Sequence, residues 1–402
     1  MHHSEDAHMA RSTQTALLDL FLVTAPGLAS LCAEEVRGNA LLAGLQSPQV
    51  ESGGVAVRGD LAALYSANLH LRTASRILVR LGEFHAENFS QLQTRAALLD
   101  WERYLPPGGA VDVRVTSHKS RLYHTGAVAE RVANAIGDRL GQPPLLQKHD
   151  EERDEAGAQL IVVRLLYDTC TISVDASGAL LHRRGYRLAT AKAPLRETLA
   201  AGLLLASGWD GDAPPPLLDP FCGSGTIPIE AAMLALQLAP GRNRRFAFMD
   251  WPDFAVATWQ TLLERADALA HARRAQIGDR LVIQASDRDA GAIEAAQANA
   301  QRAGVADVIA FACRAISAIE PPDAPGHIVT NPPYGQRVRS GGDLRNLYAQ
   351  LGKVLRMHCP GWRVTLLSAD RALLGQTGLR LDTSLTFVNG GIDVIVARGV
   401  VT

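Results

Sequence analysis

The chain has 402 residues, 47% of them apolar and 20% charged, and a formal net charge of −1. A chain of this size can bury about two or three cores, so we expect more than one domain. The near-zero charge excludes a protein that binds a polyanion through its overall charge, which leaves any phosphate binding to local basic clusters.

The cysteines and the chain start favour a protein of the reducing cytoplasm. Five cysteines, an odd number without CxxC spacing, argue against a disulfide framework and against a structural zinc site. Residues 1–14 lack the apolar core of a signal peptide and are typical of a disordered start or a tag remnant. The longest apolar stretches are too short to span a bilayer, so we expect no membrane partner, and we assign no metal site.

Residues 15–85 predict a ferredoxin-like domain, because their patterns follow the order βαββαβ. The expected elements are strand 16–24, helix 28–37, a hairpin of 49–51 and 55–58 around Gly53 and Gly54, helix 61–71 and strand 76–84. This order can form a small independent unit.

Residues 86–180 predict a second α+β domain. The expected elements are helix 89–99, strand 111–116, helix 125–140 and a hairpin of strands 160–166 and 171–175. The charged, proline-bearing stretch 142–157 predicts a surface loop. A plain dimerisation or spacer domain would fit the same pattern.

Residues 181–402 alternate strands with helices, which predicts a doubly wound parallel sheet. The expected strands are 217–219, 281–285, 308–312, 328–330 and 364–368, followed by an antiparallel hairpin of 384–388 and 392–397. An insertion at 240–271 carries Trp251, Phe254 and Trp259, which we expect to pack rather than to face a substrate.

A glycine-rich turn follows the first of these strands, in the sequence LLDPFCGSGT at 217–226. A strand, a glycine turn and a helix start bring backbone amides and the positive end of a helix dipole beside a ligand. The third glycine of a dinucleotide fingerprint would fall at Pro228, so a nicotinamide site is disfavoured. Cys222 has no histidine near it in sequence, and we interpret it as a small turn residue rather than a nucleophile.

The second strand ends in Ser286, Asp287, Arg288 and Asp289. A carboxylate at this strand tip is where a parallel sheet holds ribose hydroxyls, which makes Asp287 the candidate and Asp289 a helix cap. The alternative is that both aspartates are caps.

Asn331, Pro332, Pro333 and Tyr334 follow a short buried strand. The Asn331 side chain and the Pro332 carbonyl can together accept both hydrogens of a planar NH2 group, and Tyr334 can stack on the ring that carries it. This predicts a site that reads an aromatic amine. The alternative is a rigid turn made by two prolines.

Four basic clusters could meet a polyanion, although each one alone could be a solvated face. They are Arg114, His118, Lys119, Arg121 and His124; His182, Arg183, Arg184 and Arg187; Arg242, Arg244 and Arg245; and Arg337 and Arg339.

At these motifs the chain resembles class I S-adenosylmethionine-dependent methyltransferases that carry an N-terminal THUMP domain and modify RNA. The likeness is greatest to bacterial guanine-N2 methyltransferases of ribosomal RNA and tRNA, whose relatives are often labelled N6-adenine DNA methylases. The shared motifs are SRLYHT at 120–125, HRRGYR at 182–187, APLRETLAAGLL at 193–204, DPFCGSGT at 219–226, SDRD at 286–289 and NPPYGQRV at 331–338.

The resemblance implies a Rossmann-like methyltransferase domain over 181–402, a THUMP RNA-docking domain over 86–180 and S-adenosylmethionine as cofactor. The implied cofactor contacts are Asp219, Phe221, Cys222, Gly223, Ser224, Gly225, Thr226, Asp287 and Arg288. The implied catalytic residues are Asn331, Pro332, Pro333 and Tyr334, and the candidate RNA contacts are Lys119, Arg121, His124, Arg183, Arg184 and Arg337. The chain departs from the family at Cys313, Arg314 and Ala315, where an acidic residue usually lies near the adenine ring.

Three functions fit these observations. The preferred one is methylation of the exocyclic N2 amine of a guanine in structured rRNA or tRNA. The others are N6-adenine methylation of DNA or RNA, which uses the same motif, and RNA binding without catalysis. The sequence leaves the target RNA and the oligomeric state open.

Overall fold

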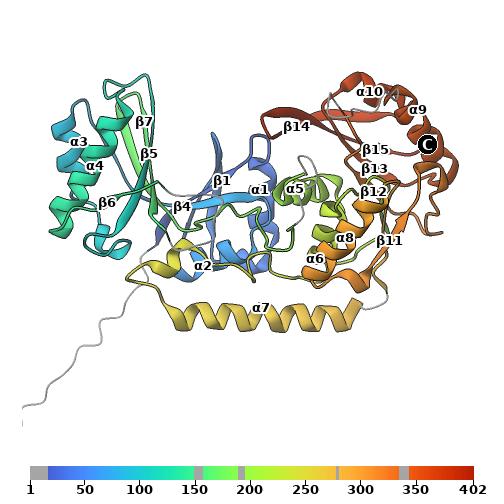
Figure 1. Ribbon diagram of the computed structural model, residues 1–402, viewed down its shortest axis with the longest axis horizontal. Helices are drawn as coiled ribbons and strands as arrows, with labels where there is room; N and C mark the ends of the chain where they lie inside the picture. The colour runs from blue at the N-terminus through green and yellow to red at the C-terminus, as the bar shows by residue number, and fades with distance from the viewer. Residues whose placement is uncertain (1–16, 149–156, 189–194, 278–279, 335–343) are drawn as a thin grey trace, which may run out of the picture.

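The structure is a computed structural model that describes residues 17–148, 157–188, 195–277, 280–334 and 344–402. Residues 1–14 and Arg337 therefore lie outside the described residues. The described residues form one eight-stranded and one seven-stranded sheet, each with helices packed on it (Figure 1). The predicted class, a Rossmann-like α/β domain preceded by two α+β domains, is confirmed.

The first six elements have the predicted βαββαβ order. They are β1 Leu18–Thr24, α1 Ala29–Gly38, β2 Gln46–Glu51, β3 Gly54–Gly59, α2 Leu61–His70 and β4 Ala74–His85. Alternation of apolar residues along β1 buries Leu18, Leu20 and Leu22 against the helices. Asp60 caps α2 by accepting a 2.8 Å hydrogen bond from the Ala63 amide.

The next elements complete the same sheet. They are α3 Phe89–Ala96, β5 Ala110–His118, α4 Thr125–Leu140, β6 Leu145–Leu146, β7 Gln159–Leu166 and β8 Thr169–Asp175. The expected loop at 142–157 contains the two-residue strand β6, which pairs with β5 in parallel. Helix α3 ends three residues earlier than expected, at Ala96.

The two N-terminal domains share one sheet, in the order β2-β3-β1-β4-β8-β7-β5-β6. Strand β4 pairs with β8 from Leu78 to His85, and one apolar core runs beneath both halves. Strand β4 is therefore both the last strand of the ferredoxin-like half and the inner neighbour of the next domain.

The seven-stranded sheet has the order β11-β10-β9-β12-β13-β15-β14. Its parallel strands are β9 Leu217–Asp219, β10 Ile283–Asp287, β11 Ile309–Cys313, β12 His327–Thr330 and β13 Arg363–Ser368, and the antiparallel hairpin is β14 Leu381–Asn389 and β15 Ile392–Val400. Its helices are α5 Glu197–Ser207, α6 Thr226–Ala235, α8 Ala290–Arg302, α9 Leu344–His358 and α10 Arg371–Gln376. Short 3-10 turns lie at Ala40–Leu42, Trp101–Arg103, Ala247–Asp250, Ala306–Val308 and Ile316–Ala318.

The insertion joins the two sheets through its aromatic side chains and through α7 Val256–Ile277. The ring of Tyr65 on α2 contacts Phe254 and Trp259, and Tyr104 contacts Trp251, so the predicted packing role is confirmed. Near the other end of α7, Arg273 donates a 2.9 Å hydrogen bond to the carbonyl of Ala235 on α6. Figure 1 shows α7 running along the side of both halves.

Candidate active site

The two motifs meet at one edge of the seven-stranded sheet. Strand β9 lies between β10 and β12 and is parallel to both, so all three carboxyl ends reach the same edge. Oγ1 of Thr330, the last residue of β12, donates a 2.6 Å hydrogen bond to Oδ1 of Asp219, the last residue of β9. The loop that begins at Asn331 therefore lies beside the glycine turn.

Backbone contacts hold the glycine turn against β10. The Cys222 amide donates to the Ser286 carbonyl at 3.0 Å, and the Gly223 amide donates to Oδ2 of Asp287 at 3.1 Å. Gly223 has a φ of 52°, and a Cβ there would meet no heavy atom within 4 Å, so a ligand can approach its backbone closely. Gly225 has a φ of 85° and starts α6, where a Cβ would lie 3.0 Å from that of Ala296.

Asp219 is buried, with 1% of its surface exposed. Burial raises the pKa of its carboxyl to about 7, although the hydrogen bonds from Thr330 and from the Phe221 amide oppose the shift. Its Oδ2 atom has no hydrogen-bond partner among the described residues. A buried acceptor of this kind fits a cationic donor such as the ammonium group of a methionine moiety.

The tip of β10 carries two aspartates with different contacts. Asp289 accepts hydrogen bonds from the amides of Gly291 and Ala292, which confirms that it caps α8. Asp287 instead contacts the glycine turn, and its Oδ1 accepts from the Asp289 amide at 3.0 Å. Arg288 is exposed beside it. On the neighbouring strand, Cys313 pairs with Asp287 in register.

The residues of the loop 331–334 are partly or fully buried. Oδ1 of Asn331 is buried and accepts no hydrogen bond within the described part of the chain. Pro332 is buried, and Pro333 and Tyr334 are partly buried. The ring of Tyr334 lies against the apolar clusters on both sides of the sheet. This places an acceptor and an aromatic ring next to the glycine turn.

Cys222 does not have the environment of a nucleophile. Its side chain is buried, and burial together with the charge of Asp219 raises the pKa of its thiol far above the ordinary value. We retain the interpretation that it is a small turn residue.

The loop after β5 exposes cations beside aromatic rings. Lys119 and His124 are exposed, as are Tyr123 and Tyr167, which keep 68% and 61% of their surface accessible. Nζ of Lys119 lies 3.1 Å from the Tyr167 hydroxyl and 5.3 Å from the centre of its ring. Arg121 is exposed too, but it forms ion pairs with Glu87 and Asp168, so its charge is compensated.

The cluster at 182–187 is largely structural. Arg184 is 5% exposed and donates 2.6 Å hydrogen bonds to the carbonyls of Leu181 and Arg72. Its Nε also lies 3.6 Å from Oε1 of Glu230 on α6. The prediction that Arg184 contacts RNA is therefore wrong, because its guanidinium is used inside the protein to join the N-terminal sheet to α6.

Two further arginines of the basic clusters have internal roles, Arg187 and Arg244. Arg187 forms a buried ion pair with Glu197. Arg244 is buried and donates to the carbonyls of Leu180 and Arg183. Burial and the surrounding arginines lower the pKa of His182 to about 3, so this ring adds no positive charge at neutral pH. Arg183 is partly exposed and stays a candidate contact.

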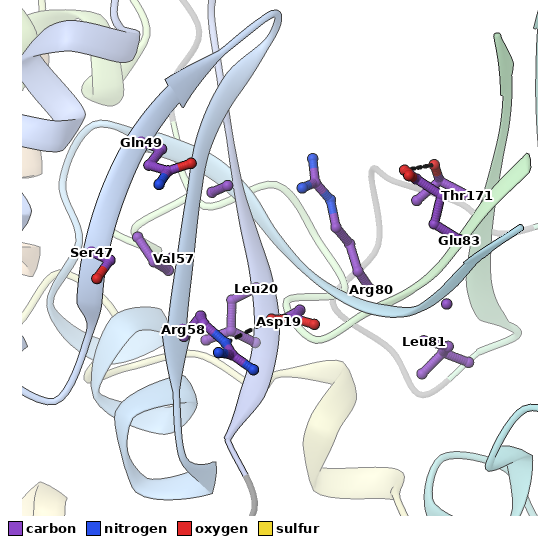
Figure 2. A pocket seen from close by; sticks show the side chains of 12 residues that line it. Asp19, Leu20, Ser47, Gln49, Val57, Arg58, Arg80, Leu81, Glu83 and Thr171 are labelled. Carbon is purple, nitrogen blue, oxygen red and sulfur yellow. Dashed lines mark hydrogen bonds and ion pairs between the residues drawn. The ribbon is translucent and has the colours of Figure 1, made fainter. Parts of the chain in front are cut away.

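A separate hollow of about 350 Å³ lies on the face of the eight-stranded sheet that carries Arg58 and Arg80 (Figure 2). Arg58 pairs with Asp19 at 3.0 Å, and Arg80 pairs with Glu51 at 2.6 Å. These arginines are neutralised by their neighbours, so the hollow is not a strongly basic surface.

Two residues of the site escaped the motif analysis. Thr330 could have been noticed, because it is a polar residue that ends an apolar strand. Asn389 could not have been noticed from the sequence. Its Nδ2 donates a 3.4 Å hydrogen bond to the Tyr334 hydroxyl, and 55 residues separate the two.

Among the described residues, no group of three or more His, Cys, Asp or Glu side chains could hold a metal ion. The described helices are all too short or too polar to cross a membrane.

Comparison with known proteins agrees with this architecture. Three family models match consecutive parts of the chain: the RlmL ferredoxin-like domain over residues 19–78, the THUMP domain over 86–175 and the RMKL-like methyltransferase domain over 184–397. The chain is 37% identical over 387 residues to the ribosomal RNA large subunit methyltransferase K/L of Psychromonas ingrahamii, covering 94% of this chain and 50% of that protein. The chain thus spans about half the length of the K/L relatives that it matches.

A second relative matches from end to end. The candidate RNA methyltransferase slr0064 of Synechocystis sp. is 35% identical over 383 residues, covering 94% of this chain and 95% of that protein. Among solved structures, SMU.472, a candidate methyltransferase complexed with SAH, superimposes with a TM-score of 0.83 at 30% identity, covering 96% and 98% of the two chains. The chain therefore belongs to the RMKL-like methyltransferase family, with an RlmL-type ferredoxin-like domain and a THUMP domain before the methyltransferase domain.

Proposed function

We propose that this protein transfers a methyl group from S-adenosylmethionine to the exocyclic N2 amine of a guanine in structured RNA, either rRNA or tRNA. The observation that carries the proposal is that Oδ1 of Asn331 is buried and has no hydrogen-bond partner among the described residues, in a loop that Thr330 fixes beside Asp219. We infer the class of substrate from the family, and the chemistry from the residues at this edge of the sheet.

The residues present fit the cofactor. Asp219 offers a buried acceptor to the ammonium group, Gly223 leaves room for the methionine moiety, and Asp287 lies where ribose hydroxyls bind. Bound there, S-adenosylmethionine supplies a sulfonium methyl that is already activated. The SAH complex of the similar SMU.472 supports the same choice of cofactor.

The chain's own contribution would be orientation of the amine. An aromatic amine is a poor nucleophile because its lone pair is delocalised into the ring. Hydrogen bonds from the NH2 group to Asn331 Oδ1 and the Pro332 carbonyl would favour a pyramidal nitrogen and aim its lone pair at the cofactor. Tyr334 would stack on the base and replace part of the stacking that is lost when the base is flipped out.

RNA would reach the protein through the loop after β5 and the adjoining turn between β7 and β8, which carries Tyr167. Lys119 and His124 can meet phosphates, while Tyr123 and Tyr167 offer exposed rings for unpaired bases. Arg183 and Arg337 remain proposed contacts. Arg121 would contribute less to phosphate binding, because its charge is already paired with the carboxylates of Glu87 and Asp168.

The test is methylation in vitro of total RNA from a strain that lacks the gene. Purified protein, labelled S-adenosylmethionine and this RNA are incubated, and the nucleosides are separated by mass spectrometry. We expect labelled N2-methylguanosine. Labelled N6-methyladenosine would establish the adenine alternative, and RNA binding without any labelled nucleoside would establish the noncatalytic one.

A further inference from the structure

We propose that Asn389 is a positioning residue for Tyr334, and that the hairpin carrying it links the N-terminal sheet to the base-binding loop. The proposal rests on the proposed function, in which Tyr334 stacks on the target base. Asn389 and Gly27, which carry the proposal, lie outside all the motifs of the candidate active site.

The first observation is the contact between Asn389 and Tyr334. Asn389 ends β14 directly before the turn at Gly390 and Gly391 and is 8% exposed. Its Nδ2 donates a 3.4 Å hydrogen bond to the Tyr334 hydroxyl. Apolar side chains of two core clusters pack against the partly buried Tyr334. The hydrogen bond supplies the directional contact.

The second observation is that the same end of β14 is attached to the first domain. The Val388 amide donates a 3.2 Å hydrogen bond to the carbonyl of Pro26, in the loop between β1 and α1. The next residue, Gly27, has a φ of 90°, and a Cβ there would lie 1.9 Å from the Thr386 carbonyl oxygen. Only glycine permits this approach.

These contacts form a short chain of connections. Pro26 and Gly27 hold Thr386 and Val388, and the neighbouring Asn389 holds the Tyr334 hydroxyl. Strand β14 is the edge of its sheet, so its outer side is free to make this contact. A displacement of the N-terminal sheet, such as RNA docking could produce, would reach the tyrosine through two hydrogen bonds.

The kinetic test is a double-mutant cycle of Asn389→Ala and Tyr334→Phe. We expect Asn389→Ala to lower kcat by about three- to tenfold, the range of one lost hydrogen bond, with KM for RNA changed less than about twofold. In the Tyr334→Phe background the same substitution should have no further effect, because the hydroxyl is already gone. Asn389→Asp, which can accept from the hydroxyl, should restore most of the rate. Equal losses in both backgrounds would overturn the proposal.

A spectroscopic test is independent of catalysis, so it separates failure of this proposal from failure of the proposed function. The protein is labelled with 3-fluorotyrosine, and the resonance of residue 334 is assigned by its loss in Tyr334→Phe. Asn389→Ala should shift or broaden this resonance, and Asn389→Asp should largely preserve it. An unchanged resonance in Asn389→Ala would contradict the positioning role, whatever the enzyme methylates.

Two matched variants, Gly27→Ala and Gly53→Ala, test whether the first domain influences Tyr334 through the hairpin. Gly27→Ala places a methyl group against Thr386 and should shift the fluorine resonance of residue 334. Gly53 has a nearly equal φ of 89° and no heavy atom within 4 Å of a Cβ, so Gly53→Ala imposes similar backbone strain without the contact. It should leave the resonance in place. The same shift in both variants, or in neither, would overturn the link.

Discussion

Thr330 and Asp219 connect the two motifs of the site through a 2.6 Å hydrogen bond between their side chains. The donor hydroxyl stabilises the ionised carboxylate, so it lowers a pKa that burial raises. Because Thr330 directly precedes Asn331, one contact fixes the glycine turn and the loop 331–334 relative to each other.

Replacing Thr330 by Val removes this hydroxyl and keeps the shape of the side chain. The pKa of Asp219 should rise further, and affinity for S-adenosylmethionine at pH 7 should fall by about three- to tenfold. Calorimetric titration of variant and wild type should show the ratio of the two affinities approaching one as the pH is raised to 8.5. Thr365→Val, in the neighbouring strand β13, is the control. A ratio that does not depend on pH would show that the loss is structural.

Cofactor affinity should depend on pH through Asp219. A bound ammonium group favours the ionised carboxylate, whose pKa in the free protein is about 7. Below pH 7 a proton must first be released, so the dissociation constant should rise by up to about tenfold per pH unit. Asp219→Asn should weaken binding and remove this dependence between pH 5.5 and 7.5. Because the charge of Asp287 also raises the pKa of Asp219, Asp287→Asn should move the midpoint to lower pH. If the dissociation constant of Asp219→Asn changes with pH as steeply as that of the wild type, another titrating group causes the dependence.

The loop after β5 should contribute to RNA affinity in two separable ways. Lys119→Ala removes an exposed ammonium group that we propose to contact a phosphate, so binding should weaken and the slope of log affinity against log salt should fall by about one. Tyr123→Ala removes a stacking surface, so affinity should fall by about fivefold or more with the salt slope unchanged. Fluorescence anisotropy with labelled RNA measures both. Unaltered affinity in the two variants would exclude this loop as a docking site.

Arg184 should affect stability rather than RNA binding. Arg184→Met removes one of the two buried guanidinium groups beside Glu230, together with the donor to the carbonyls of Leu181 and Arg72, so the free energy of unfolding should fall by about 3 kcal/mol. Denaturant titration gives this value, and RNA affinity of the folded variant should match that of the wild type. Lys119→Ala should show the opposite result: its RNA affinity should fall, and its free energy of unfolding should equal that of the wild type. An Arg184 variant that is stable but binds RNA poorly would reinstate the sequence-based interpretation.

The fold was largely predictable because its elements carry strong local patterns. Short apolar runs after turns predicted every parallel strand of the seven-stranded sheet, and the Asn389, Gly390 and Gly391 turn predicted its hairpin. The joining of β4 to β8 was not predictable, because that pairing is set by contacts between segments about 90 residues apart rather than by either strand alone.

The meeting of the two motifs at one edge of the sheet was predictable from the sequence, whereas the surroundings of the charged residues were not. The glycine turn and the loop at Asn331 come from strands whose ends must meet at one edge. The burial of Arg184 could not be seen, because a run of basic residues has the same composition whether it faces solvent or Glu230. The hairpin contact of Asn389 depends on tertiary packing and has no sequence signature.

The most direct test of the central claim is single-turnover methyl transfer by Asn331→Ala. We predict that binding of S-adenosylmethionine and RNA stays within about twofold of the wild type, while transfer falls by about 100-fold or more, because the amine loses the acceptor that orients it. Asn39→Ala, which removes an amide in the first domain, should transfer at the wild-type rate. Undiminished transfer by Asn331→Ala would contradict the account.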